Sequence, residues 1–193
     1  MAARRVMDIN SADNIIWSHI IKGEEKAFEI LFMRYYPGLI RYAKNLLPYP
    51  NDEAEDIITD AFFKIWQQRE TVNIHTSVVS YLYVVVRSRI YDFYRAKRMH
   101  VPIEDALDFA GPEYLVPDHL LVYKELCMEM EYLISLLPKR TRLIYQMNRN
   151  DNITYKDIAV ILDISVNSVK THMYRAISFL KESYYASPKN SGC

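Results

Sequence analysis

The chain has 193 residues, 50% of them hydrophobic, and its 24 Lys and Arg balance 24 Asp and Glu. This length suits one large domain or two small ones, and no segment reaches the roughly 18 to 20 apolar residues that a membrane-spanning helix requires. Because the first 25 residues are also too charged for a signal peptide, we expect a soluble, cytoplasmic protein that does not insert into a membrane.

The residues before about position 100 follow a helical pattern, and no alternation typical of strands competes with it. We expect helices over 11–21, 24–47, 51–69 and 77–98. Asn10-Ser11 and Asn51 are suited to cap the first and the third helix, and Pro37-Gly38 is expected to bend the second. This part of the sequence therefore predicts an all-α fold.

An acidic segment divides the chain. Residues 101–138 hold 1 basic and 8 acidic side chains, whereas residues 139–193 hold 9 basic and 4 acidic ones. The stretch VPIEDALDFAGPEYLVPDH also contains three of the eight prolines and lacks a helical or strand period. We therefore predict two small helical domains, 1–99 and 118–193, joined by an acidic flexible linker over 100–117. The alternative is one domain with a long surface loop, which compact domains seldom carry.

The residues after the linker are again helical. We expect helices over 118–136, 138–148, 154–162 and 166–185, with Asp118 as a cap and Pro138 in a first turn. The last two, within TYKDIAVILDISVNSVKTHMYRAISFL, have the form of a helix-turn-helix. Thr154 is suited to cap the first of this pair, Ile164 to fill the turn, and Asp163 stands where such turns usually have Gly.

The final helix separates an apolar side from a polar, cationic side. Its apolar stripe consists of Val169, Met173, Ala176 and Leu180. The opposite side presents Asn167, Thr171, Tyr174 and Arg175, with Ser168 and Lys170 on its flanks. Short hydrogen-bonding groups suit base edges and cations suit phosphates, so this side predicts a DNA-reading helix. The alternative is the solvated face of an ordinary helical hairpin.

The expected helix over 77–98 interleaves arginines with tyrosines on one side. Its apolar stripe consists of Leu82, Val86 and Phe93. The opposite side presents Ser80, Arg87, Tyr91, Arg95 and Arg98, with Ser88 and Tyr94 at its margins. Guanidinium groups hold phosphates and phenol rings stack on unpaired bases, so this pattern is suited to single-stranded nucleic acid. The alternative is half-buried packing of a tyrosine-rich helix.

The expected helix over 51–69 carries an aromatic residue among carboxylates on its outer side. Its core side consists of Ile57, Ile58, Ala61, Phe62 and Ile65. The opposite side presents Asp56, Asp60, Phe63 and Gln67. An aromatic ring in an acidic, solvated setting fits a basic protein partner. The alternative is a charged solvent face with one isolated Phe.

Taken in order, these segments resemble the extracytoplasmic-function group (group IV) of the sigma-70 family of bacterial RNA polymerase sigma factors. The resemblance spans about residues 20–183 and is carried by FEILFMRYYPGLIRYAKNLL, AEDIITDAFFKIW, SYLYVVVRSRIYDFYR, LLPKRTRLIYQM and the helix-turn-helix. It implies sigma region 2 before the linker and sigma region 4 after it. It also implies a factor that directs promoter-specific transcription initiation, with core RNA polymerase, promoter DNA and an anti-sigma factor as partners.

The resemblance and the helix faces together predict which residues contact each partner. Those for core polymerase are Asp56, Asp60, Phe63, Trp66 and Gln67. Those for the promoter −10 element are Arg87, Ser88, Tyr91, Asp92, Arg95 and Arg98. Those for the −35 element are Ser165, Asn167, Ser168, Lys170, Thr171, Tyr174 and Arg175. Thr59 and Ser88 depart from the Gln and Asn that the family commonly has there.

Two other classes of protein compete with this interpretation. SVNSVKTH is also similar to LuxR-type DNA-binding domains, so a LuxR-type regulator that is not a polymerase subunit is the alternative function, although no strand-helix alternation precedes the motif. An enzyme has less support, because His75, His100 and the nearby carboxylates lack metal or triad spacing. Cys127 and Cys193 lack zinc spacing and no glycine-rich nucleotide loop occurs, so we expect no catalytic residue, metal or cofactor.

Overall fold

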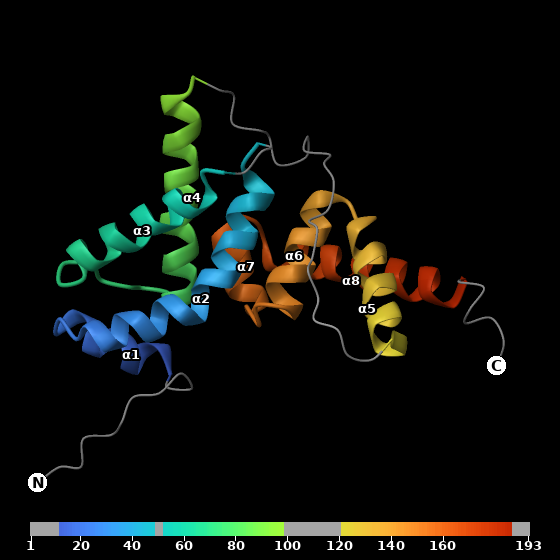
Figure 1. Ribbon diagram of the computed structural model, residues 1–193, viewed down its shortest axis with the longest axis horizontal. Coiled ribbons are helices and arrows are strands. Elements are labelled where there is room, and N and C mark those ends of the chain that lie inside the picture. The colour runs from blue at the N-terminus through green and yellow to red at the C-terminus, as the bar shows by residue number, and fades with distance from the viewer. Residues whose placement is uncertain (1–11, 49–51, 99–120, 187–193) are drawn as a thin grey trace, which may run out of the picture. The chain divides into compact units, whose positions relative to one another are not determined.

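The structure is a computed structural model that describes residues 12–48, 52–98 and 121–186 (Figure 1). Within these ranges all regular secondary structure is helical, which confirms the predicted fold class. The helices are α1 (Asp13–Ile21), α2 (Glu25–Leu46), α3 (Ala54–Gln68), α4 (Val78–Ala96), α5 (Leu121–Ser135), α6 (Lys139–Arg149), α7 (Tyr155–Leu162) and α8 (Val166–Ala186).

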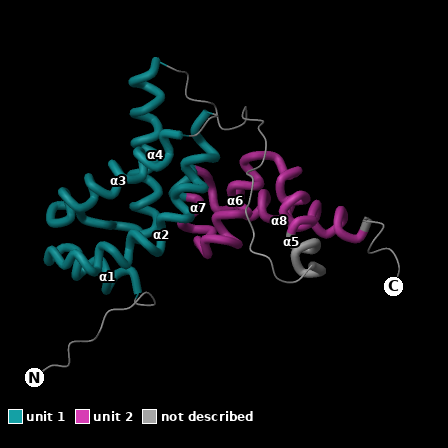
Figure 2. The backbone as a smooth tube through the Cα atoms, in the orientation of Figure 1, with its two compact units in different colours: residues 1–101, 160–163 teal, residues 102–159, 164–193 magenta. Residues whose placement is uncertain are grey.

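The chain divides into two compact units, residues 1–101 with 160–163 and residues 102–159 with 164–193 (Figure 2). Helices α1 to α4 belong to the first unit, and α5, α6 and α8 belong to the second. The predicted linker over 100–117 and the expected caps Asn10, Ser11 and Asp118 lie outside the described residues. The predicted domain limits, 1–99 and 118–193, therefore stay predictions.

The helices begin and end within a few residues of their expected positions. Ser77 caps α4, because its Oγ accepts a hydrogen bond of 3.1 Å from the Ser80 amide. Asn51, the expected cap of α3, lies outside the described residues; the helix begins at Ala54 with Glu53 in the cap position. Pro138 is likewise the N-cap residue of α6 and not part of its first turn.

Helix α2 is central to the first unit, because it packs against α1, α3 and α4. Tyr42 of α2 and Tyr83 of α4 are both buried, and their rings meet edge to face with centroids 5.1 Å apart. The Tyr94 hydroxyl donates a hydrogen bond of 2.7 Å to the Leu46 carbonyl at the end of α2. These contacts fix one side of α4 against α2, while Ser88 and Arg95 on its other side are exposed.

Helix α1 is attached to α2 by a polar cluster and to α4 by an aromatic contact. The Asp13 carboxylate accepts hydrogen bonds from the Arg34 guanidinium and the Tyr35 hydroxyl. Burial and the hydrogen bond to Asp13 raise the pKa of Tyr35 far above its ordinary value, so its hydroxyl stays protonated and keeps donating. The rings of Trp17 and Tyr81 meet edge to face with centroids 5.7 Å apart.

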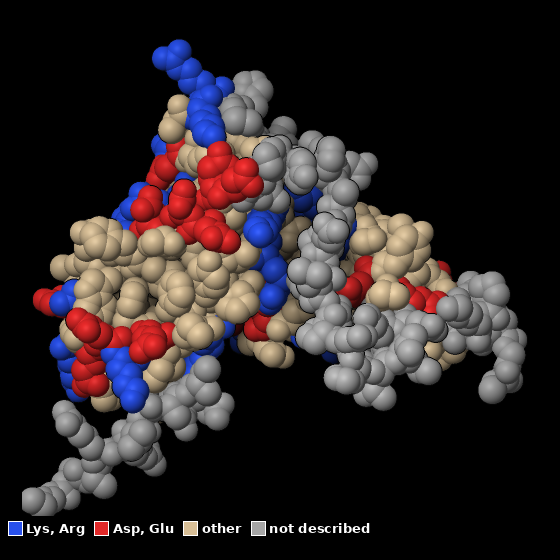
Figure 3. All heavy atoms as spheres, in the orientation of Figure 1, with Lys and Arg blue, Asp and Glu red and all other residues tan. Residues whose placement is uncertain are grey.

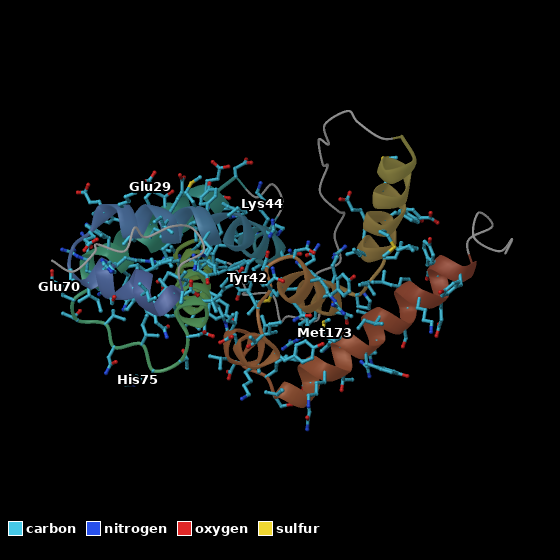
Figure 4. All side chains as sticks on the ribbon, turned by 90° about the horizontal axis from the view of Figure 1, so that it is seen from below. Glu29, Tyr42, Lys44, Glu70, His75 and Met173 are labelled. Carbon is cyan, nitrogen blue, oxygen red and sulfur yellow. The ribbon has the colours of Figure 1, made fainter. Side chains whose placement is uncertain are left out.

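In the second unit, α8 packs against α5 and α6. Leu133 and Leu137 form a buried cluster with Ala176 and Leu180 of α8. The stripe predicted for this helix is confirmed, since Val169, Met173, Ala176 and Leu180 are all buried. Met173 is labelled in Figure 4. Burial of this stripe leaves the polar side of α8 exposed.

Candidate functional site

Helix α7, the turn 163–165 and α8 form the predicted helix-turn-helix. Thr154 caps α7, because its Oγ1 accepts a hydrogen bond of 3.2 Å from the Asp157 amide. Asp163 takes a left-handed backbone conformation with φ of 54°, which Asp tolerates better than most residues. The following amide, that of Ile164, donates a hydrogen bond of 3.0 Å to the Ala159 carbonyl, and this bond closes the turn.

The outer side of α8, which we call the α8 face, consists of Ser165, Asn167, Ser168, Lys170, Thr171, Tyr174 and Arg175. Ser165 caps the helix, because its Oγ accepts a hydrogen bond of 3.0 Å from the Ser168 amide. The Thr171 hydroxyl donates to the Asn167 carbonyl at 2.9 Å. The exposed side chains of Asn167, Lys170, Tyr174 and Arg175 make no hydrogen bond or ion pair with other described residues. Two hydroxyls of this face thus stabilise the helix, while two cations, an amide and a phenol are available to a ligand.

The outer side of α4, which we call the α4 face, consists of Arg87, Ser88, Tyr91, Asp92, Arg95 and Arg98. Arg87 Nε donates a hydrogen bond of 3.0 Å to the Tyr91 hydroxyl, and the guanidinium carbon lies 5.3 Å from the ring centroid. Arg95 forms an ion pair with Asp92, and Arg98 follows the helix with a left-handed φ of 52°. Arg87 therefore restrains the orientation of the Tyr91 ring.

Two residues predicted on or beside the α4 face are buried instead. Ser80 has 0% exposure, because its hydroxyl accepts a hydrogen bond of 2.9 Å from the Ser77 hydroxyl within the helix cap. Tyr94 is buried because its hydroxyl reaches the Leu46 carbonyl. Phe93, predicted in the apolar stripe, is only half-buried. The core side of α4 comprises Val78, Leu82, Tyr83, Val86, Ile90 and Tyr94.

Sequence reasoning missed two residues near the α4 face. The ammonium group of Lys97 lies 4.4 Å above the Phe93 ring and forms an ion pair with Glu53 at the start of α3. The hydrogen bond from Lys97 lowers the pKa of the Glu53 carboxyl. Nothing in the sequence links positions 53 and 97, so only the fold shows this contact.

The second missed residue is Val84, which is exposed one turn of helix before Ser88. It belongs to a run of three valines, so the sequence alone does not show which of the three is exposed.

The outer side of α3 matches its prediction. Asp56, Asp60, Phe63 and Gln67 are exposed, and we call this set the α3 face. Phe63 is 61% exposed, while the five residues predicted for the core side are buried. An exposed ring of this size among carboxylates is the kind of surface that a protein partner covers.

Trp66 does not share this exposed side. It is half-buried, with its ring centroid 5.0 Å from that of Phe28 in α2. The Arg69 guanidinium carbon lies over the Trp66 ring, 4.4 Å from its centroid, and a guanidinium nitrogen donates to the Trp66 carbonyl at 2.7 Å. The predicted contribution of Trp66 to a partner contact therefore stays a prediction, at the edge of the α3 face.

Charges of opposite sign gather on different parts of the first unit. Figure 3 shows acidic side chains over the region of α3 and α4, and Lys and Arg side chains at the C-terminal end of α4. The acidic residues of α3 are Glu55, Asp56 and Asp60, and the basic residues near the end of α4 are Arg95, Lys97 and Arg98. The two faces therefore suit partners of opposite charge.

The described residues contain no group of His, Cys, Asp and Glu that could hold a metal ion. His75 is exposed and lies at the periphery of the first unit (Figure 4). None of the described helices is long and apolar enough to cross a membrane.

Two protein-family models match the chain. The model of Sigma-70 region 2 matches residues 31–99, and the model of Sigma-70 region 4 matches residues 127–180. The first match contains the α3 and α4 faces, and the second contains α7, the turn and the part of α8 that presents the α8 face. Together the two models cover most of the described residues.

Curated relatives are similar over nearly their whole length. The ECF RNA polymerase sigma-E factor of Escherichia coli (strain K12) is 24% identical over 173 residues, which cover 85% of this chain and 90% of the relative. The protein of the same name from Haemophilus influenzae is 25% identical over 178 residues, with the same two shares of 85% and 90%.

Two solved structures share the fold. CnrH in complex with the cytosolic domain of CnrY matches with a TM-score of 0.56 and 17% identity, over 92% of this chain and 99% of that chain. The sigma factor RpoE in complex with the anti-sigma factor NepR from Bartonella quintana matches with a TM-score of 0.56 and 18% identity, over 84% and 99%.

Proposed function

Because this chain belongs to the extracytoplasmic-function group of the sigma-70 family, we propose that its α3, α4 and α8 faces bind core RNA polymerase, the promoter −10 element and the −35 element, in that order. The chain is an RNA polymerase sigma factor that acts in transcription initiation. Sigma factors are regulatory and non-catalytic, and we propose that this chain likewise has no catalytic activity. The match to sigma region 2 also counts against the LuxR-type alternative, which has no such module.

The main support for the proposal is the composition of the α8 face. It presents a cationic, hydrogen-bonding surface on the second helix of a helix-turn-helix, the helix that enters the major groove in this class of motif. Arg175 and Asn167 are suited to base edges, since a guanidinium pairs with guanine and a carboxamide with adenine. Lys170 is suited to a backbone phosphate, because a compact ammonium group acts as a point charge.

The α4 face is suited to an unpaired strand at the −10 element. Tyr91 offers a ring on which a base can stack, and its hydrogen bond to Arg87 restrains that ring before DNA arrives. Arg95 and Arg98 are exposed and add positive charge for the phosphates of the same strand.

The α3 face is suited to a basic protein surface. Phe63 provides an apolar anchor. Asp60 precedes it by about one turn of helix and Asp56 by about two turns, so both carboxylates can pair with cations around that anchor. Thr59, the departure from the family pattern, directs its hydroxyl to the Glu55 carbonyl at 2.8 Å. Its side chain therefore leaves the neighbouring carboxylates unobstructed.

We further propose that an anti-sigma factor regulates this chain in the cytoplasm. RpoE, which shares the fold, was solved with the anti-sigma factor NepR, and CnrH was solved with the cytosolic domain of CnrY. A comparable partner here would compete for at least one of the three faces. The acidic linker over 100–117 and the domains on either side of it, 1–99 and 118–193, are part of the same proposal.

Reconstituted transcription tests the function. Purified chain is added to core RNA polymerase on a library of promoter templates, and run-off transcripts are sequenced. We expect specific start sites only when chain and core are both present. A chain that footprints duplex DNA alone, and neither binds core nor changes its start sites, would be a LuxR-type regulator instead.

A further inference from the structure

A hydrogen bond joins α6 to α8 across an interface whose other buried residues are apolar. Thr141, in the first turn of α6, is 4% exposed, and its Oγ1 lies 2.9 Å from His172 Nδ1 on α8. The apolar residues buried on these two helices are Leu143, Ile144 and Met147 of α6 and Val169, Met173, Ala176 and Leu180 of α8. This bond is therefore a directional contact in a packing that is otherwise apolar.

His172 lies at the border between the buried stripe and the α8 face. It follows Thr171, which is exposed, and precedes Met173, which is buried. Residues three positions apart share one side of a helix, so His172 lies on the same side as Arg175. A contact at His172 therefore restrains the part of the helix that presents Arg175.

Apolar burial is non-directional, so the stripe alone permits α8 to rotate slightly about its own axis. A rotation of about 20° moves an atom about 6 Å from that axis by about 2 Å, which is enough to break a hydrogen bond to a base. The bond from Thr141 resists such a rotation, because rotation would leave a buried hydroxyl without a partner.

We propose that the Thr141–His172 hydrogen bond sets the rotational position of α8 and thereby determines which side chains of the α8 face reach the bases of the −35 element. Thr141 is thus a positioning residue for promoter specificity, although it is buried and does not touch DNA. This inference rests on the proposed reading of the −35 element by the α8 face.

The test compares variants of the full chain bound to core RNA polymerase. Thr141→Val keeps the side-chain shape and removes the hydroxyl, whereas Thr141→Ser keeps the hydroxyl. Ser135→Ala is the matched control, because it deletes a hydroxyl of the same unit that bonds only within its own helix, to the Tyr132 carbonyl at 2.6 Å. Each holoenzyme is measured against promoters with every single-base change in the −35 element.

We expect Thr141→Val to lower the preference for the best −35 sequence over its single-base variants by about tenfold, which corresponds to about 1.4 kcal/mol. Thr141→Ser and Ser135→Ala should keep the wild-type ranking. His172→Phe removes the same bond from the other side, so it should reproduce the loss if Thr141→Val does not fold.

The possible outcomes separate the reading of the −35 element by α8 from the positioning role of Thr141. A wild-type holoenzyme that does not discriminate among −35 sequences rejects the reading by α8, and this inference with it. A wild-type enzyme that does discriminate, together with folded Thr141→Val and His172→Phe enzymes that keep its ranking, overturns the positioning role alone. A Thr141→Ser enzyme that behaves like Thr141→Val overturns the role of the hydroxyl.

Discussion

Replacing Phe63 with Ala should weaken binding to core RNA polymerase and leave the fold intact. Phe63 is 61% exposed, so most of its ring is available to a partner. Complete burial of a Phe side chain contributes about 1.5–3 kcal/mol, so burial of the exposed part contributes about 1–2 kcal/mol. The dissociation constant should therefore rise about 5- to 30-fold.

The preceding residue provides a matched control. Phe62 is 3% exposed, and its ring centroid lies 4.8 Å from that of Phe32 and 5.8 Å from that of Phe28. Phe62→Ala should lower the free energy of unfolding by about 3–5 kcal/mol, because it opens a cavity among these rings. Phe63→Ala should change it by less than about 0.5 kcal/mol, as exposed substitutions usually do.

Urea denaturation followed by circular dichroism measures the stability of each variant, and fluorescence anisotropy of labelled chain titrated with core polymerase measures affinity. If Phe63→Ala lowers the free energy of unfolding as much as Phe62→Ala does, our assignment of the core and outer sides of α3 is wrong. If it folds and binds core as tightly as wild type, the α3 face is not the polymerase contact. Adding Asp56→Asn should weaken binding further, mainly at low salt, because exposed charges are screened by salt.

Lys170→Ala should weaken binding to all −35 sequences by a similar factor and reduce the salt slope by about 0.9 per lost phosphate contact. Arg175→Ala should instead change the order of affinities among those sequences and cost about 1–3 kcal/mol of binding free energy on the preferred one. If a salt-dependent binding panel gives the reverse pattern, Arg175 contacts the phosphate and Lys170 the base. Tyr91→Ala should cost about 1–3 kcal/mol in binding of single-stranded −10 DNA, measured by anisotropy, whereas Tyr91→Phe should keep most of the affinity; equal losses would assign the effect to the hydroxyl. Burial and the neighbouring Arg142 lower the pKa of Lys139 from 10.5 to about 8. The unfolded chain therefore binds the ammonium proton of Lys139 more tightly than the folded chain does, and the free energy of unfolding rises with pH between about 8 and 10.5. Lys139→Met should therefore raise the free energy of unfolding at pH 7, and a gap to wild type that does not shrink by pH 10 would contradict this.

The features that the sequence predicts well are those that depend on a single helix. The stripe of Val169, Met173, Ala176 and Leu180 is buried, and Phe63 is exposed beside a buried Phe62, because helical periodicity alone separates these sides. The exposure of the candidate contact residues is predictable for the same reason. Their roles in binding come from family resemblance, because no property of a single helix names its partner.

The features that the sequence does not predict depend on contacts between distant elements. The predicted stripe of Leu82, Val86 and Phe93 places Ser80 on the opposite side of the helix and Tyr94 at its margin. Each hydroxyl instead finds a partner inside the first unit, which makes its burial favourable. The Lys97–Glu53 pair and the Thr141–His172 bond join residues 44 and 31 positions apart. Such pairs follow from how helices are brought together and not from the period of either one.

The left-handed turn at Asp163 has a consequence for how this helix-turn-helix can diverge. An Asp codon becomes a Gly or an Asn codon by one nucleotide change, and both residues adopt a φ near 54° readily. A Val codon is equally close in the genetic code, but a β-branched side chain is strongly disfavoured in that conformation. Among descendants of this gene, position 163 should therefore drift between Asp, Asn and Gly while Val is removed by selection.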